Sequence, residues 1–284
     1  MSSLAERAAV VALLRNGRWP WQEYADMIED AGSALAILEE EEGLLASERL
    51  ADAREEIERW QARGMQPVTL LDPVYPANLR AVHDRPPLIF VSGQLQPGDG
   101  RSVAVVGTRL ASPEKARIAR AISEHLVDHG YTVVSGLASG IDTAVHTAAL
   151  AHGGRTLAVI GTGLARCYPP QNARLQRRIA GECAVISQFW PDTPPSRRSF
   201  PMRNAVISGL TLATVVVEAS RTSGSRLQTR LALAQGRSVL LVNTLLDQQW
   251  ARELSKRSGT YVVGSAGEIT DIVERLTSSS ALTA

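Results

Sequence analysis

The sequence predicts an α/β protein in which a small N-terminal helical module precedes a doubly wound, mostly parallel sheet. After residue 101, short and almost wholly apolar segments alternate with amphipathic ones, which is typical of parallel strands covered by helices on both faces. Before residue 66, apolar residues recur at steps of three and four, as they do in helices. We therefore expect a helical module over residues 1–65 and an extended Rossmann-like domain over residues 66–284.

The expected elements follow this pattern in chain order. In the first module, helices are expected over Ala5–Leu14, Trp21–Asp30, Ser33–Leu38 and Ala46–Ala62. Strands are expected over Gln66–Leu71, Leu88–Ser92, Val103–Val106, Tyr131–Ser135, Thr156–Ile160, Ala184–Ser187, Leu212–Glu218 and Ser238–Val242. The remaining helices are expected over Pro113–His129, Ile141–His152, Asn172–Ala180, Ser225–Gln235 and Ala266–Leu276. Ser112 is expected to cap the helix that begins at Pro113.

Composition limits the classes of protein that the chain can represent. Its 284 residues are 44% hydrophobic and 21% charged, which are ordinary values for a globular protein. No run of about 20 apolar residues is present, so we expect no membrane span, and the N-terminus lacks the pattern of a secretory signal. Cys167 and Cys183 form no CxxC pair, which argues against a zinc site or a disulfide scaffold and favours the cytoplasm.

Charge is distributed unevenly along the chain. Residues 1–100 carry 9 Lys and Arg against 17 Asp and Glu, whereas residues 101–240 carry 17 against 7. Almost all of these cations are arginine, which binds phosphate in a planar, bidentate way. A GC-rich coding bias would explain the choice of arginine over lysine, but it would not explain the regional excess. The excess indicates an anionic partner for the middle segment.

Glycine- and hydroxyl-rich loops follow four of the expected parallel strands. Ligands of such sheets bind beyond the carboxyl ends of the strands, where backbone N–H groups and helix N-termini favour phosphate. The four loops are Gly107-Thr108-Arg109, Ser135-Gly136-Leu137-Ala138-Ser139-Gly140, Gly161-Thr162-Gly163, and Arg221-Thr222-Ser223-Gly224-Ser225 after Glu218. Taken singly, each glycine turn also fits a purely structural corner. Their convergence on one edge favours phosphate binding.

The loops do not match the fingerprints of cofactor-binding enzymes. Gly161 and Gly163 supply two glycines of the dinucleotide pattern, but Arg166 stands where the third belongs. A Walker loop with its lysine is also absent from the sequence. We therefore expect neither NAD binding nor NTP hydrolysis, and no cofactor or metal.

A second cluster of polar residues lies between residues 196 and 204. It combines Arg197, Arg198 and Arg203 with Phe200 and Asn204. An aromatic ring beside cations suits unstacked bases. The alternative is a surface loop in which Phe200 fills a gap in the core.

Catalysis is not expected. None of the five histidines stands beside a nucleophile in the sequence. Asp142 follows a phosphate-type loop at a helix start, where it is expected to cap and order that loop. Glu218, at a strand end, is expected to be structural or to orient a ligand.

Taken together, these motifs resemble the bacterial DNA-processing protein A (DprA/Smf) family. The resemblance covers about residues 65–275 and rests on several motifs in order. They are VAVVGTR (103–109), VSGLASGID (134–142), AVIGTGL (158–164), YPPQN (168–172), FPMRN (200–204) and SGS (223–225).

The resemblance implies a single-stranded DNA-binding protein rather than an enzyme. It further implies a homodimer that delivers the RecA recombinase onto incoming strands during natural transformation. By position, Gly107, Thr108 and Arg109 would form the main phosphate pocket. Phe200, Arg203 and Asn204 would line the same groove, and Ser135, Gly136, Ser139 and Gly140 would shape the loop beside it.

The sequence departs from the family pattern at several positions, which leaves the ligand, the dimer surface and the RecA role open. Ala205 replaces an arginine, Arg226-Leu227-Gln228-Thr229 replaces Leu-Ile-Thr-Ala, and Asn243-Thr244 replaces Pro-Gly. The C-terminal winged-helix domain of many members is also expected to be missing. Two alternatives on the same fold therefore stay open: a sensor of a small nucleotide, and an enzyme that cleaves nucleoside monophosphates.

Overall fold

The computed structural model describes residues 3–219 and 224–281, and in this part of the chain nine strands form one sheet. Their order is β1-β2-β6-β5-β4-β3-β7-β8-β9. The strands are β1 (Gln66–Thr69), β2 (Leu88–Gly93), β3 (Ser102–Val106), β4 (Thr132–Ser135), β5 (Thr156–Val159), β6 (Ala184–Ser187), β7 (Ala213–Val216), β8 (Ser238–Val242) and β9 (Thr260–Val263). All neighbours from β6 to β9 are parallel, whereas β2 runs antiparallel to both β1 and β6. The predicted fold class, a mostly parallel α/β sheet, is confirmed.

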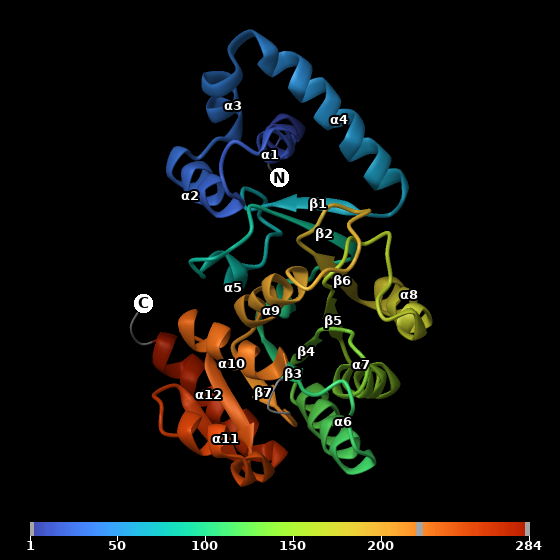
Figure 1. Cartoon of the computed structure of the whole chain (residues 1–284), viewed down its shortest axis with the longest axis vertical. Coiled ribbons are helices and arrows are strands. Elements are labelled where there is room, and N and C mark those ends of the chain that lie inside the picture. Colours follow the sequence, from blue (N-terminus) through green and yellow to red (C-terminus); the bar gives the residue numbers. More distant parts are fainter. Residues whose placement is uncertain (1–2, 220–223, 282–284) are drawn as a thin grey trace.

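Helices cover both faces of this sheet and also gather at one end of the molecule beside β1 (Figure 1). The helices at that end are α1 (Leu4–Asn16), α2 (Trp21–Ala31), α3 (Ala34–Glu42) and α4 (Ala46–Ala62). The others are α5 (Ala77–Arg80), α6 (Pro113–Asp128), α7 (Ile141–Ala151), α8 (Ala173–Glu182), α9 (Ser199–Leu210), α10 (Gly224–Ala234), α11 (Gln249–Leu254) and α12 (Ala266–Ala281). As expected, Ser112 caps α6, because its hydroxyl accepts from the N–H of Lys115. No helix in the described ranges is long and apolar enough to cross a membrane.

Alternate residues of each central strand face different layers, which explains why the strands are apolar throughout. Val103 and Val105 of β3 pack in a core with α6, α7 and α12. Ala104 and Val106 of the same strand pack in a second core with α9, α10 and the N-terminal helices. A strand buried on both faces has no polar side, so its sequence reads as a continuous apolar run.

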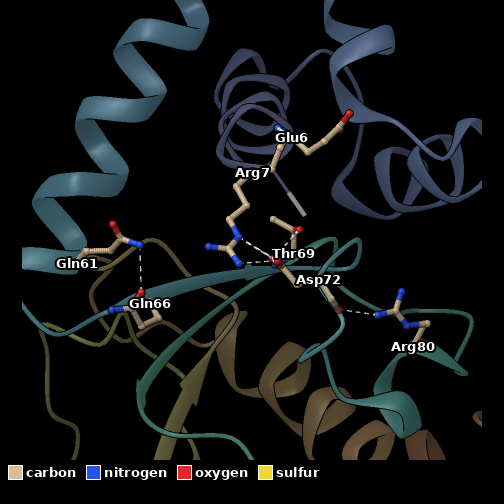
Figure 2. A network of polar contacts seen from close by, with 8 residues as sticks. Glu6, Arg7, Gln61, Gln66, Thr69, Asp72 and Arg80 are labelled. Carbon is tan, nitrogen blue, oxygen red and sulfur yellow. Dashed lines mark hydrogen bonds and ion pairs between the residues drawn. The ribbon is translucent and has the colours of Figure 1, made fainter. Parts of the chain in front are cut away.

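The helices before residue 65 share their core with the sheet, and a buried ion pair joins the two parts (Figure 2). Arg7 of α1 donates from Nε and Nη2 to Oδ1 of Asp72, at 2.9 and 2.7 Å. Asp72 is fully buried, and its Oδ2 also accepts from the N–H and hydroxyl of Thr69 at the end of β1. Beyond this pair, Trp60 of α4 packs edge-on against Phe90 of β2, with ring centroids 5.0 Å apart. The division of the chain at residue 65 stays a prediction.

The sequence analysis missed one helix that carries residues of the site. Residues 199–210 form α9, although residues 196–204 show no apolar period. The reason is burial: eight of the twelve residues of α9 are buried, including the polar Arg203 and Asn204, so polar and apolar residues do not separate onto two faces of the helix. The short strand β9 and helix α11, which follow β8, were also not expected.

Candidate functional site

A pocket of about 430 Å³ opens beyond the carboxyl ends of the central parallel strands. Since β5, β4, β3 and β7 are adjacent in the sheet, the loops that follow them meet at one edge. The pocket is lined by Val106, Gly107, Thr108, Arg109, Leu110, Ala138, Asp142, Phe200, Arg203, Asn204, Gly224, Ser225 and Gln228. A smaller hollow beside it is lined by Gly136, Ser139, Gly161, Tyr168 and Pro169 together with Arg109, Phe200 and Arg203. All four loops singled out in the sequence therefore contribute to this edge, although residues 221–223 lie outside the described residues.

Arg203 lies at the buried side of the pocket and is poorly paired. Its guanidinium is only 7% exposed, and its Nη1 is 3.9 Å from Oδ2 of Asp142, at the outer limit of an ion pair. Its Nε has no hydrogen-bond partner among the described residues. Burial lowers the pKa of Arg203, against the opposing effect of Asp142. The weak contact with Asp142 therefore does not compensate the cost of burying the charge of Arg203. An anion that enters the pocket would stabilise this charge.

Asp142 orders the loop after β4, as expected for a residue at the start of α7. Its Oδ2 accepts from the N–H of Ala138 at 3.2 Å. Burial raises the pKa of Asp142, although Arg203 opposes this shift. The pKa of each partner is shifted in the direction that favours its neutral form. The cost of burial therefore outweighs the attraction between the two charges. Asp142 therefore orders the loop through the N–H of Ala138.

Phe200 forms an aromatic platform between cationic groups. The Cζ atoms of Arg109 and Arg203 lie 4.8 and 6.0 Å from the centroid of its ring. The ring of Tyr168, which is 42% exposed, lies 5.7 Å away on the side of the smaller hollow. Arg109 itself is exposed. The arrangement places one exposed and one buried guanidinium beside an aromatic ring that a base can approach.

The loop glycines make room for the protein's own groups. A Cβ on Gly136 would lie 1.3 Å from Nη1 of Arg203, so this glycine creates the space that the guanidinium occupies. Gly140 has φ +79° and lies against the backbone of Thr108 and Arg109. The expectation that these glycines admit a phosphate directly stays a prediction. Their first role is to let Arg203 and the loop after β3 reach the pocket.

The structure brings together most of the predicted site residues, but four of them line neither cavity: Ser135, Gly140, Arg197 and Arg198. Gly107, Thr108, Arg109, Phe200, Arg203 and Asn204 line the larger pocket, and Gly136 and Ser139 line the smaller hollow. Ser135 is fully buried, and its hydroxyl donates a hydrogen bond to the carbonyl of Val105 in the neighbouring strand. Arg197 and Arg198 are exposed and line neither cavity, because they precede the first turn of α9.

Sequence reasoning missed other residues that the structure places at the site. Tyr168 belongs to a motif that was noted, but nothing in the sequence placed its ring beside Phe200. Gln228 lies on the buried face of α10, where its spacing from Ser225 and Ala232 is the only sequence signal. His146 lies in the interior close enough to Arg203 for its pKa to be affected, and no local pattern predicts that proximity.

His146 gives a test of the interior beneath the pocket. It is fully buried, and its Nδ1 lies 2.7 Å from Oγ1 of Thr156. Thr156 donates its own hydrogen to the carbonyl of Val133, so the imidazole donates from Nδ1 to Thr156. Burial, with the charge of Arg203, lowers the pKa of His146 to about 3.

We expect this histidine to make the folded protein sensitive to acid. The unfolded state takes up a proton near pH 6.5, whereas the folded state resists it down to about pH 3. Stability should therefore fall by roughly 1.4 kcal/mol for each pH unit below about 6.5. Urea unfolding at pH 7.5, 6 and 5 measures this slope, and His146→Gln should flatten it. An unchanged slope in the variant would contradict the assignment.

The comparisons with known proteins agree with this geometry. The family model described as DNA recombination-mediator protein A matches residues 66–276, which is most of the chain. The chain belongs to the DNA recombination-mediator protein A family. This family membership confirms the resemblance read from the motifs. The match begins at β1 and includes every loop of the pocket.

Several relatives of the family are similar to the chain. DNA processing protein DprA of Streptococcus pneumoniae is 41% identical over 180 residues, 63% of this chain and 64% of that protein. DprA of Bacillus subtilis is 32% identical over 213 residues, 74% of this chain and 72% of that protein. Protein Smf of Synechocystis is 38% identical over 199 residues, 69% of this chain. The alignments thus span 64% of the Streptococcus protein but only 50% of the Synechocystis protein.

Two solved structures share the fold. DNA processing protein A from Streptococcus pneumoniae superposes with a TM-score of 0.69 at 30% identity, covering 95% of this chain and 94% of that one. DNA processing protein A from Helicobacter pylori, described for its single-stranded DNA binding mode, superposes with a TM-score of 0.64 at 22% identity, covering 75% of this chain and 97% of that one. At the latter identity the likeness concerns the fold alone.

Proposed function

We propose that this chain binds single-stranded DNA in the pocket at the carboxyl edge of its sheet. The observation that carries the proposal is the buried, underpaired guanidinium of Arg203 beside Arg109 and Phe200. A phosphate between the two guanidinium groups would supply the acceptors that Arg203 lacks. An unstacked base would pack on Phe200, which is half-exposed at the rim. Double-stranded DNA keeps its bases stacked inside the helix and does not offer this contact.

Binding titrations should show a preference for single strands and a strong dependence on Arg109. Fluorescence anisotropy with a labelled oligonucleotide, single-stranded or annealed, compares the two forms. Arg109→Ala removes one charge-assisted contact, worth about 1.5–3 kcal/mol, so single-strand affinity should fall roughly 10- to 100-fold. The slope of log affinity against log salt should also become less steep by about 0.7, the value for one phosphate on a single strand.

A surface arginine of the helical module provides the matched control. Arg54 is exposed on α4, and α4 lies at the end of the molecule beside β1, away from the central strands (Figure 1). Arg54→Ala should therefore bind as the wild type does. Equal loss in both variants would mean that net charge, and not the pocket, determines binding. Affinity that stays flat between low and high salt would count against a phosphate-binding role altogether.

Two measurements with AMP, a competition titration and a turnover assay, separate the two alternative functions. A nucleotide sensor would bind AMP or a similar ligand saturably, and oligonucleotides would not compete. An enzyme of the nucleoside-monophosphate type would release free base from AMP.

The wider role that the family implies is also part of the proposal: a cytoplasmic homodimer that acts in DNA uptake and delivers RecA onto the bound strand. These points stay predictions.

A further inference from the structure

Two amide side chains form a wall of the same pocket. Gln228 of α10 and Asn204 of α9 both line the pocket, and both are almost fully buried, at 1% and 8% exposure. The orientation of each amide decides whether this wall offers donors or acceptors. In both cases the hydrogen-bond network fixes it.

The nitrogen of Gln228 is fully used within the protein. Nε2 donates to the carbonyl of Asn204 at 3.0 Å and to the hydroxyl of Ser208 at 2.8 Å. A backbone carbonyl only accepts, so the nitrogen and not the oxygen must point toward it. Ser208 donates its own hydrogen to the same carbonyl, which leaves its oxygen free to accept from Gln228. Within the described residues no donor bonds to Oε1 of Gln228, and this oxygen is left for the pocket.

Asn204 is oriented in the same way. Its Nδ2 donates to the carbonyl of Gly224 at 3.3 Å, again an atom that only accepts. Its Oδ1 receives no hydrogen bond from the part of the chain that the structure describes. The wall between α9 and α10 therefore presents two acceptor oxygens, and the guanidinium groups of Arg109 and Arg203 line the same pocket.

The acceptor oxygens of the wall and the donor groups of the two arginines can hold different parts of a nucleotide. A phosphate has only acceptor oxygens at neutral pH, so it belongs with the arginines. A buried acceptor pair needs hydrogens from its ligand, because leaving it unpaired is costly. The exocyclic amino group of cytosine or adenine carries two hydrogens. Thymine and uracil offer a single N–H flanked by two carbonyl oxygens, which would face the acceptors of the wall.

We propose that Gln228 and Asn204 select bases that carry an exocyclic amino group over thymine and uracil. The inference rests on the proposed function, since it assumes that a strand enters this pocket. The pocket volume of about 430 Å³ lies in the range of small-molecule sites, roughly 300–1,000 Å³. Gln228 is a specificity-determining residue in this scheme, and Arg109 and Arg203 supply affinity.

Oligo(dC) and oligo(dU) of equal length provide the sharpest comparison. The two bases have nearly the same size. Cytosine carries an amino group at position 4 and no hydrogen on N3, whereas uracil carries an oxygen at position 4 and a hydrogen on N3. At pH 8 and fixed salt, the wild-type protein should bind oligo(dC) about tenfold more tightly. Equal affinity, or a preference for oligo(dU), would overturn the inference while leaving the proposed function intact. Failure to bind either strand would overturn the proposed function itself.

Two variants connect the preference to the wall. Gln228→Met keeps the length of the side chain but removes its oxygen, so the preference for oligo(dC) should fall to about twofold or less, with little change for oligo(dU). Ser208→Ala removes a partner of Gln228 without removing an acceptor from the pocket, and it should keep the preference. Persistence of the full preference in Gln228→Met would overturn the role of Gln228. The wild-type comparison needs no variant, so it decides the question even if Gln228→Met unfolds.

Discussion

Replacing Arg203 with methionine should abolish detectable single-strand binding, with a loss of at least about 100-fold in affinity. Arg203 is 7% exposed and held in one place, so a phosphate that reaches it forms its contact in a water-poor site. Removing one partner of such a buried charge pair typically costs 2–5 kcal/mol, and about 3 kcal/mol corresponds to 100-fold. Anisotropy titration of Arg203→Met against the wild type measures this loss.

Stability must be separated from binding in this experiment. The single variant leaves Asp142 buried without its countercharge, which should lower the melting temperature at neutral pH. The double variant Arg203→Met, Asp142→Asn removes both charges while the amide keeps a carbonyl to accept from Ala138. We expect it to melt at or above the wild-type temperature and still not to bind. A double variant that regains binding would show that Arg203 only balances Asp142.

Gly140→Ala should destabilise the folded protein by about 3 kcal/mol and disrupt the pocket. Gly140 has φ 79° and ψ −121°, a conformation that only glycine adopts readily. A Cβ there would lie 2.4 Å from the carbonyl oxygen of Thr108 and 2.7 Å from the backbone of Arg109. Both atoms are main chain, so neither can move aside without displacing the loop that carries Arg109.

Gly153→Ala provides the matched control for Gly140→Ala. Gly153 has a similar φ of +71°, but a Cβ would meet nothing within 4 Å. It should therefore show the backbone strain alone, about 1–2 kcal/mol, without loss of binding. Urea unfolding and strand titration of both variants measure the difference. Equal stability of the two variants would mean that the approach of Gly140 to Thr108 is unimportant.

The loops at the carboxyl edge could be predicted from the sequence because their positions depend on simple rules. Continuous apolar runs predicted parallel strands, and parallel strands place their carboxyl ends on one edge. Gly107 to Arg109 and Gly136 to Ser139 therefore lie where the pattern placed them. Arg197 and Arg198 were grouped with Arg203 by nearness in sequence, which does not determine the direction of a side chain at the start of a helix.

The sequence by itself determined the alternation of buried strands and covering helices, and with it the edge at which the loops meet. It also determined the family, through motifs that recur in a fixed order. Only the tertiary structure decided that α9 is a helix, because polar as well as apolar residues of α9 are buried and no amphipathic period results. Only the tertiary structure placed Asp142 beside Arg203 and Gln228 beside Asn204, because packing brings together residues whose separation along the chain gives no local signal.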